Sequence, residues 1–312
     1  MEIIRNPRFD FLGKARFFVV LSVLLVAVGV SLMAARGLNY GVEFSGGTQL
    51  IVQFTQAPQI DRVRDAVSPV DPGAVIQSYG EARGSKVLIR IAGQGEGAAG
   101  DLDALARRVL ESLAASYPQN PVTEASSEIV GPIVGAELRQ RAITLTVLGL
   151  LFQLVYIAIR FKGGIWGAAA SLAAVHDVLV CVGFLTFFGF EITLNVIAAL
   201  LTLVGYSVND TIVIFDRVRE NLRQRRKDPL AQTINDSLNQ TLTRTLISNG
   251  TTFLAVLGLF LFGGEVLRGF GFTMVVGILV GTYSTIYIAA PLVVWWNDLN
   301  QRRRPPAVKA AM

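Results

Sequence analysis

Six long apolar blocks dominate the pattern of hydrophobic and polar positions along the chain. They run over 17–35, 142–159, 164–189, 192–215, 246–262 and 269–296. Each approaches the roughly 20 residues that an α-helix needs to cross a hydrocarbon core, the fifth once its polar start is included. The pattern therefore predicts six transmembrane helices, at 17–35, 140–160, 164–189, 192–215, 244–262 and 269–296, with one domain outside the lipid at 36–139.

The first block could also be a cleaved signal peptide. Arg5, Arg8, Lys14 and Arg16 precede it, and 33–35 reads Met-Ala-Ala, which is faintly like a cleavage site. Its apolar core is longer than the roughly 7–15 residues of a signal peptide. We therefore interpret it as a retained helix.

Basic residues predict the orientation of the chain. They crowd into the N-terminal arm at 1–16, the connection after the second block, the connection 216–243 and the tail 297–312. The two short connections on the other side, after the third and the fifth blocks, carry only Arg268. Because Lys and Arg favour the cytoplasmic side, both termini are expected inside and the segment 36–139 in the periplasm.

Strand-like and helix-like patterns follow one another along the segment 36–139. Strands are expected at 48–54, 74–80, 86–92 and 123–130, with helices at 59–67 and 101–117. The order β-α-β-β-α-β is the ferredoxin-like arrangement. The predicted fold is thus a mainly α membrane protein with one small α+β ferredoxin-like domain between the first two membrane helices.

The connection 216–243 is charged at first and then amphipathic. Leu230, Ile234 and Leu238 recur at helical spacing. This pattern predicts an interfacial helix on the cytoplasmic face.

Composition narrows the classes of function. Charged residues make up 16% of the chain, against roughly 25% in an average soluble domain. The net charge is +5, and the basic residues cluster beside the apolar blocks. Membrane topology therefore explains the positive charge better than nucleic-acid binding does. The single cysteine, Cys181, cannot form an intrachain disulfide, and a single histidine argues against a zinc site. No metal or cofactor is expected.

Ionisable residues stand inside the third and fourth apolar blocks and at the start of the fifth. His176 and Asp177 lie about 18 Å into the third block, Asp210 lies in the fourth, and Arg244 lies at the start of the fifth. A carboxylate at the centre of a membrane helix costs roughly 2.5–3.5 kcal/mol, so it marks a functional site or a partner.

Two interpretations fit these charges. One is a proton relay, in which burial favours the neutral Asp210 and a nearby Arg244 favours the ionised one. The other is a hydrogen-bonded pair that only locks helices together. His176 and Asp177 diverge by about 100° around a helix and need not share a partner.

The sequence argues against an enzyme. Ser207 or Ser171 with His176 could suggest an intramembrane protease, but the sequence holds no GxSxG element, P-loop, GxGxxG fingerprint or paired carboxylates. Small residues in the later blocks, including Gly277 and Gly281 at GxxxG spacing, fit close helix packing.

Several motifs resemble the SecF family, the smaller subunits of the bacterial SecDF protein-export complex, which belongs to the resistance-nodulation-division superfamily. GYSVNDTIVIFDRVREN at 205–221, GVEFSGGTQL at 41–50 and LFGGEVLRGF at 261–270 carry the resemblance, together with His176-Asp177. It covers nearly the whole chain in order. Glu43 departs conservatively from the aspartate usual in the family.

The resemblance implies a multi-pass protein of the inner membrane that uses the proton-motive force. It implies SecD and the SecYEG translocon as partners, with YajC and YidC also possible, and unfolded preprotein as the substrate. Asp210 and Arg244 match the family's proton-path residues, and Asn209 and Thr211 flank the aspartate. A small-molecule exporter of the same superfamily and a passive assembly scaffold are the rival functions.

Overall fold

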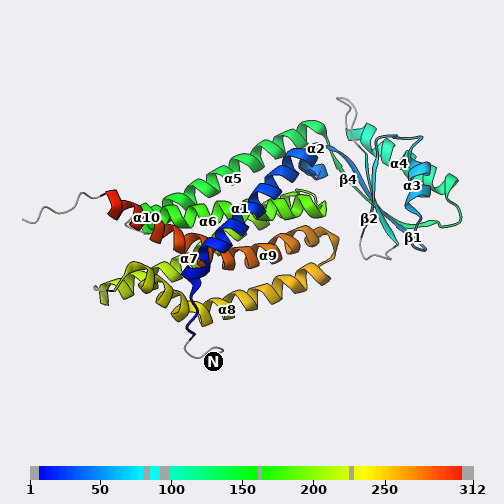
Figure 1. The fold of residues 1–312 in the computed structure, drawn as a ribbon. Coiled ribbons are helices and arrows are strands. Elements are labelled where there is room, and N and C mark those ends of the chain that lie inside the picture. The colour runs from blue at the N-terminus through cyan, green and yellow to red at the C-terminus, as the bar shows by residue number, and fades with distance from the viewer. Residues whose placement is uncertain (1–6, 80–84, 92–98, 161–163, 225–227, 304–312) are drawn as a thin grey trace, which may run out of the picture.

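The computed structural model describes residues 7–79, 85–91, 99–160, 164–224 and 228–303. Long helices form a bundle, and a small sheet domain stands at one end of it (Figure 1). The first residues of α1 and the end of α10 both lie toward the opposite end of the bundle (Figure 1).

Six helical segments among the described residues are long and apolar enough to cross a membrane, which confirms the predicted number. They are α1 (Phe11–Arg36), α5 (Pro132–Arg160), α6 (Gly164–Phe188), α7 (Leu194–Gln224), α8 (Leu230–Phe262) and the segment formed by α9 (Gly264–Ser284), the π-helical turn η1 (Thr285–Ala289) and α10 (Ala290–Arg303).

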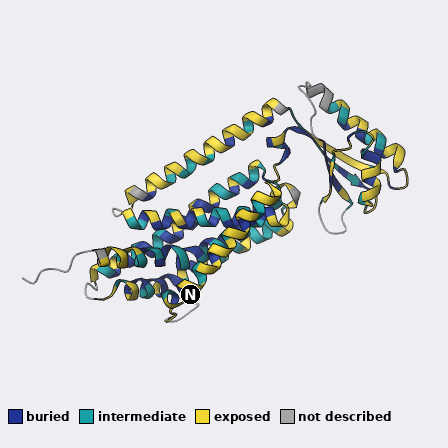
Figure 2. Ribbon diagram, turned by 45° about the horizontal axis from the view of Figure 1, so that its top comes forward, coloured by how far each residue is buried: buried dark blue, intermediate teal, exposed yellow. Residues whose placement is uncertain are grey.

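The bundle has a centre and a periphery. About half of the apolar window is buried in α6, α7 and the α9–α10 segment, against about a tenth in α1, α5 and α8. Figure 2 shows this division, with α5 exposing most of its length. Since lipid solvates apolar side chains, the exposed faces of the outer helices are suited to a bilayer.

The helices extend beyond the apolar blocks. The α1 helix begins at Phe11, six residues before its block, and the Asp10 side chain caps it by accepting from the Gly13 amide at 2.8 Å. Asn235 and Asn239 of α8 bond the backbone of Phe9, which fixes the start of α1 on α8.

The predicted interfacial helix within 216–243 is wrong. The α7 helix continues to Gln224, and α8 runs unbroken from Leu230 to Phe262, so the amphipathic stretch is the first part of a membrane helix. Its apolar stripe, Ile234 and Leu238, is buried in the cluster that includes Phe215 and Val218 of α7. Protein, not a lipid surface, covers that face.

The sheet domain, residues 47–130, confirms the ferredoxin-like prediction. Its strands are β1 (Gly47–Phe54), β2 (Val75–Tyr79), β3 (Lys86–Ile91) and β4 (Val122–Val130), antiparallel in the order β2-β3-β1-β4. The helices α3 (Ile60–Val67) and α4 (Ala99–Ser116) pack on the sheet through a core that holds Leu50, Val52 and Phe54 of β1. Alternation along β1 sends these three to one face.

Short connections join the sheet domain to the bundle. The one-turn helix α2 (Val42–Ser45) leads into β1, and α5 starts two residues after β4. Residues 132–139, expected in the external domain, therefore belong to α5. The amide of Gly41 donates to the carbonyl of Ile192 at 2.9 Å, which ties this linker to the turn between α6 and α7.

Candidate functional site

The ionisable residues predicted inside the membrane lie on neighbouring central helices. Asp177 of α6 is fully buried, and Asp210 of α7 is 7% exposed. The two carboxylates occupy separate polar clusters.

Asp177 is held by hydrogen bonds from three helices. Its Oδ2 accepts from the Ser207 hydroxyl of α7 at 2.5 Å and from the Ser284 hydroxyl of α9 at 2.8 Å. Its Oδ1 lies 3.0 Å from Nδ1 of His176. Three partners meet at this carboxylate, so Asp177 joins α6, α7 and α9.

His176 extends this cluster toward α1. Its ring lies against that of Tyr283, with centroids 6.3 Å apart, and its Nε2 is buried without a hydrogen-bond partner in the described part of the chain. The Tyr283 hydroxyl bonds Ser22 of α1 at 2.7 Å. A buried ring nitrogen with no partner is a polar atom that a water could satisfy.

Asp210 is hydrogen-bonded by a residue of α8. Its Oδ2 accepts from Nδ2 of Asn249 at 2.7 Å. The same amide nitrogen donates to the Thr282 hydroxyl of α9 at 2.6 Å, and Oδ1 of Asn249 accepts from the Tyr206 hydroxyl at 2.9 Å. Asn249 therefore joins α7, α8 and α9 at the carboxylate.

The two clusters meet along α9. Thr282 belongs to the Asp210 cluster and Ser284 to the Asp177 cluster, while the hydroxyl of Thr285 lies 3.0 Å from that of Thr211 on α7. The π-helical turn begins at Thr285. Such turns are rare and frequent at functional sites. Residues 282–285 thus connect both carboxylates to one irregular piece of backbone.

The other predicted relay residues lie elsewhere than expected. Arg244 is exposed and forms no hydrogen bond or ion pair with the described residues, although its charge acts on Asp210 through space. It precedes Asn249 by five residues, which places it about 140° around α8. Asn209 is exposed, and Thr211 bonds Thr285 and the Ser207 carbonyl instead of Asp210.

Sequence reasoning missed Asn249, Tyr206 and Thr282. The available signal was the polar run Ser-Asn-Gly-Thr-Thr at 248–252, which interrupts the start of the fifth apolar block. The sequence marks Gly281 only as a small residue, and it marks Ser207 only as a small residue or as the hydroxyl of an intramembrane protease. In the described ranges no three His, Cys, Asp or Glu side chains gather as a metal site would require.

Arginine does pair with a carboxylate outside the membrane helices. Arg90 of β3 forms an ion pair with Glu191, which lies in the turn between α6 and α7, and donates to the Tyr40 carbonyl at 3.3 Å. Burial raises the pKa of Glu191, against the lowering effect of Arg90. Burial and the nearby Glu43 raise the pKa of Glu128 in the same region.

Two family models match the chain. "Protein export membrane protein SecD/SecF, C-terminal" covers residues 109–299, and "SecD/SecF GG Motif" covers residues 31–58.

Full-length relatives agree with the family models. The protein translocase subunit SecF of Gemmatimonas aurantiaca is 38% identical, over 99% of this chain and 95% of the relative. That of Calditerrivibrio nitroreducens is 40% identical, over 97% and 99%.

The fold matches solved structures of SecDF. The crystal structure of SecDF from Thermus thermophilus superposes with a TM-score of 0.82 at 38% identity, over 94% of this chain and 39% of that chain. SecDF in a super-membrane-facing form gives 0.70 at 37% identity, over 96% and 40%. The chain thus spans about two fifths of the length of these SecDF chains. From the family models, the relatives and the fold together, the chain belongs to the SecD/SecF family of protein-export membrane proteins, as a SecF-type protein translocase subunit.

Proposed function

We propose that this chain is an auxiliary subunit of the Sec translocase that uses the proton-motive force, with SecD, to promote preprotein translocation across the cytoplasmic membrane. The observation that carries the proposal is Asp210, a buried carboxylate whose only described hydrogen bond comes from Asn249 of a neighbouring helix. A carboxylate in this setting is costly in a membrane and is retained for a function.

Protonation of Asp210 would change the hydrogen bonds that its neighbours form with it. The ionised group accepts from the Asn249 amide and attracts Arg244, whereas the protonated group carries a hydrogen that needs an acceptor. Because Asn249 also bonds Thr282 and Tyr206, a changed bond at Asp210 alters the packing of α7, α8 and α9.

His176 and Asp177 form the second element of the proposed relay. They share a hydrogen bond and connect to α7 and α9 through Ser207 and Ser284. Thr211 connects the two elements through Thr285. Asn209 lies next to Asp210 on the exposed side of α7, where it would line the route of the proton with Arg244.

The energy available is on the right scale. One proton crossing 100 mV supplies about 2.3 kcal/mol. A hydrogen bond to a charged group contributes roughly 1.5–3 kcal/mol. One transferred proton therefore suffices to exchange one such bond for another.

The exposed polar positions on α7 and α8 support a membrane partner. Gly205 and Asn209 recur at helical spacing on α7, and Arg244, Ser248 and Thr251 do so on α8. Lipid is a poor solvent for these groups, so another membrane helix should cover them. We assign this surface to SecD. SecYEG, assisted by YajC and YidC, would then supply the unfolded preprotein.

Movement would reach the sheet domain through α5. That helix starts two residues after β4, so a displaced helix would carry the strand with it. The sheet domain would contact the emerging preprotein or the external domain of SecD.

The test is translocation into vesicles that contain this chain with SecD and the translocon. Asp210→Asn and Arg244→Lys should each abolish the gradient-dependent part of translocation and leave the gradient-independent part intact. Asp298→Asn, the same change at an exposed position of α10, is the matched control. If gradient-dependent translocation survives both relay substitutions, the chain acts as a passive scaffold.

A further inference from the structure

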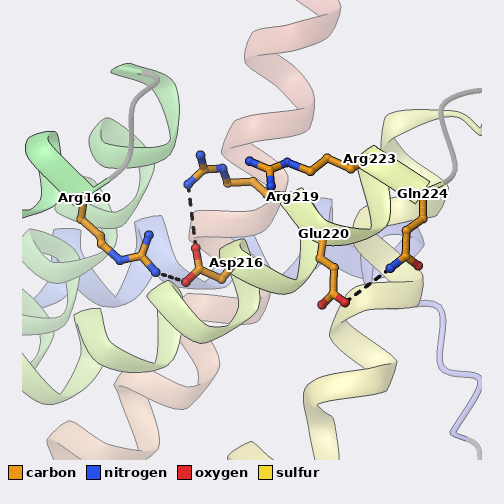
Figure 3. Close-up of a pocket in the computed structure, with 6 residues that line it drawn as sticks. All are labelled: Arg160, Asp216, Arg219, Glu220, Arg223 and Gln224. Atoms are coloured by element: carbon orange, nitrogen blue, oxygen red, sulfur yellow. Dashed lines mark hydrogen bonds and ion pairs between the residues drawn. The ribbon is translucent and has the colours of Figure 1, made fainter.

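A charged cavity lies where α5 ends and α7 leaves its apolar stretch, at the end of the bundle remote from the sheet domain. Its volume is about 370 Å³. The lining residues are Arg160, Asp216, Arg219, Glu220, Arg223 and Gln224. Figure 3 shows Arg160 reaching from α5 toward Asp216 on α7. None of these side chains takes part in the carboxylate clusters described above.

Both carboxylates of the cavity already have partners. Asp216 forms an ion pair with Arg160 and lies 3.8 Å from Arg219. Glu220 accepts from Arg217 at 2.7 Å and from Gln224 at 3.4 Å. One of the two negative charges is therefore shared with Arg217, an arginine that does not line the cavity.

The arginines of α7 are left with an excess of positive charge. Arg223 makes no hydrogen bond or ion pair with any residue that the structure describes. It stands one helical turn after Arg219, and Figure 3 shows the two side chains extending over the same part of the cavity. Like charges at this spacing repel each other. An anion placed between them would remove that repulsion and bond both guanidinium groups.

The surroundings fit a lipid anion. Tyr156 and Ile159, on the last turns of α5, are 57% and 74% exposed, so apolar surface adjoins the charged cavity. Basic pockets between membrane helices, at the level of the headgroups, bind anionic phospholipids.

We infer that this cavity binds the phosphate group of an anionic phospholipid. Arg219 and Arg223 hold the phosphate, and the acyl chains lie along the exposed apolar face of α5. Together with the Arg160–Asp216 ion pair, the lipid links α5, which carries the sheet domain, to α7, which carries Asp210. The inference does not depend on proton coupling.

Native mass spectrometry of the purified full chain tests the site. The chain is titrated with phosphatidylglycerol and, in parallel, with zwitterionic phosphatidylcholine. Arg219→Gln/Arg223→Gln should weaken retention of phosphatidylglycerol by about 30-fold, since each basic residue contributes about 1 kcal/mol at a lipid surface. Arg16→Gln/Arg302→Gln removes the same charge from exposed positions outside the cavity and should change retention less than threefold.

Two further arms identify the ligand. Arg219→Lys/Arg223→Lys keeps the charge and should retain phosphatidylglycerol within a few-fold of the parent chain. Inorganic phosphate at millimolar concentration should not displace the lipid. Equal losses of phosphatidylglycerol retention in the cavity variant and the control variant would overturn the site. A lysine variant that binds this lipid as weakly as the glutamine variant would also overturn it. Displacement by inorganic phosphate would overturn the lipid assignment in favour of a free anion.

Discussion

The regions around Asp177 and Asp210 use the same side chain in opposite ways. Asp177 is fully enclosed and accepts from two serine hydroxyls of two other helices, with His176 beside it. Asp210 lies nearer the surface of the chain and has a single described donor, Asn249. The first arrangement fixes helices in place, whereas the second leaves room for a bond to change.

Glycines around the two carboxylates support this contrast. A Cβ at Gly281, beside Asp177, would lie 3.2 Å from Cβ of Ser207. At Gly250, next to Asn249, nothing lies within 4 Å. Packing is therefore tighter beside Asp177 than beside Asn249, the partner of Asp210.

The largest expected effect is on stability. Asp177→Ala leaves Ser207, Ser284 and His176 without their shared acceptor and should lower the free energy of unfolding by about 3–5 kcal/mol. Asp210→Ala removes one bond and should cost about 1–2 kcal/mol. Denaturant titration in mixed micelles measures both, with Asp298→Ala as the exposed control. Equal losses at 177 and 210 would remove the contrast between the two sites.

A second prediction concerns coupling to the gradient. Asn249→Ala removes the donor to Asp210 and should reduce gradient-dependent translocation by about tenfold, because a bond to a charged group contributes at least about 1.5 kcal/mol. Asn300→Ala, exposed on α10, should have no effect. Unchanged coupling in Asn249→Ala would mean that Asp210 works without this amide.

Packing gives a smaller and more local test. Gly281→Ala should destabilise the chain by about 1 kcal/mol, since Ser207 must yield to the new methyl group. Gly250→Ala meets open space and should stabilise α8 by up to about 1 kcal/mol through helix propensity. Thermal unfolding of the two variants, measured side by side, compares them directly. If both substitutions shift stability in the same direction, the inferred difference in packing between Gly281 and Gly250 is wrong.

The smallest effect is expected at Glu191, the carboxylate that does have an arginine partner. Burial raises the pKa of Glu191, and burial with Glu43 raises that of Glu128. Both acids therefore bind protons more readily when the sheet domain is seated on the bundle. Protonation of the two acids therefore stabilises the contact between the sheet domain and the bundle at low pH. This contribution is lost as the pH rises above the usual glutamate range.

Hydrogen exchange at residues 189–193 measures how firmly the sheet domain stays docked on the bundle. After correction for intrinsic exchange, protection should be greater at pH 5 than at pH 7. Glu128→Gln/Glu191→Gln should remove the difference, while Arg90 and Arg268, the cations of this region, keep their charge throughout. Greater protection at pH 7 would show that the Arg90–Glu191 ion pair outweighs burial.

Much of the fold could be predicted from the sequence because each signal was local. Apolar blocks of membrane length predicted six helices, and alternation at 48–54 predicted a strand with one buried face. The amphipathic stretch around Ile234 and Leu238 was misassigned because its periodicity is the same whether lipid or protein covers it. The presence of α7 beside it decided the outcome.

The sequence by itself determined which residues are costly in a membrane: Asp177 and Asp210 stand inside apolar blocks, and Arg244 stands at the edge of one, whatever the packing. Only the tertiary structure decided their partners. Each residue turns the side chain by about 100° around a helix, so depth along the chain leaves direction open. Helix packing brought Asn249 onto Asp210 and left Arg244 exposed without an ion pair in the described residues, and it placed Ser207 and Ser284, distant in sequence, on the same oxygen of Asp177.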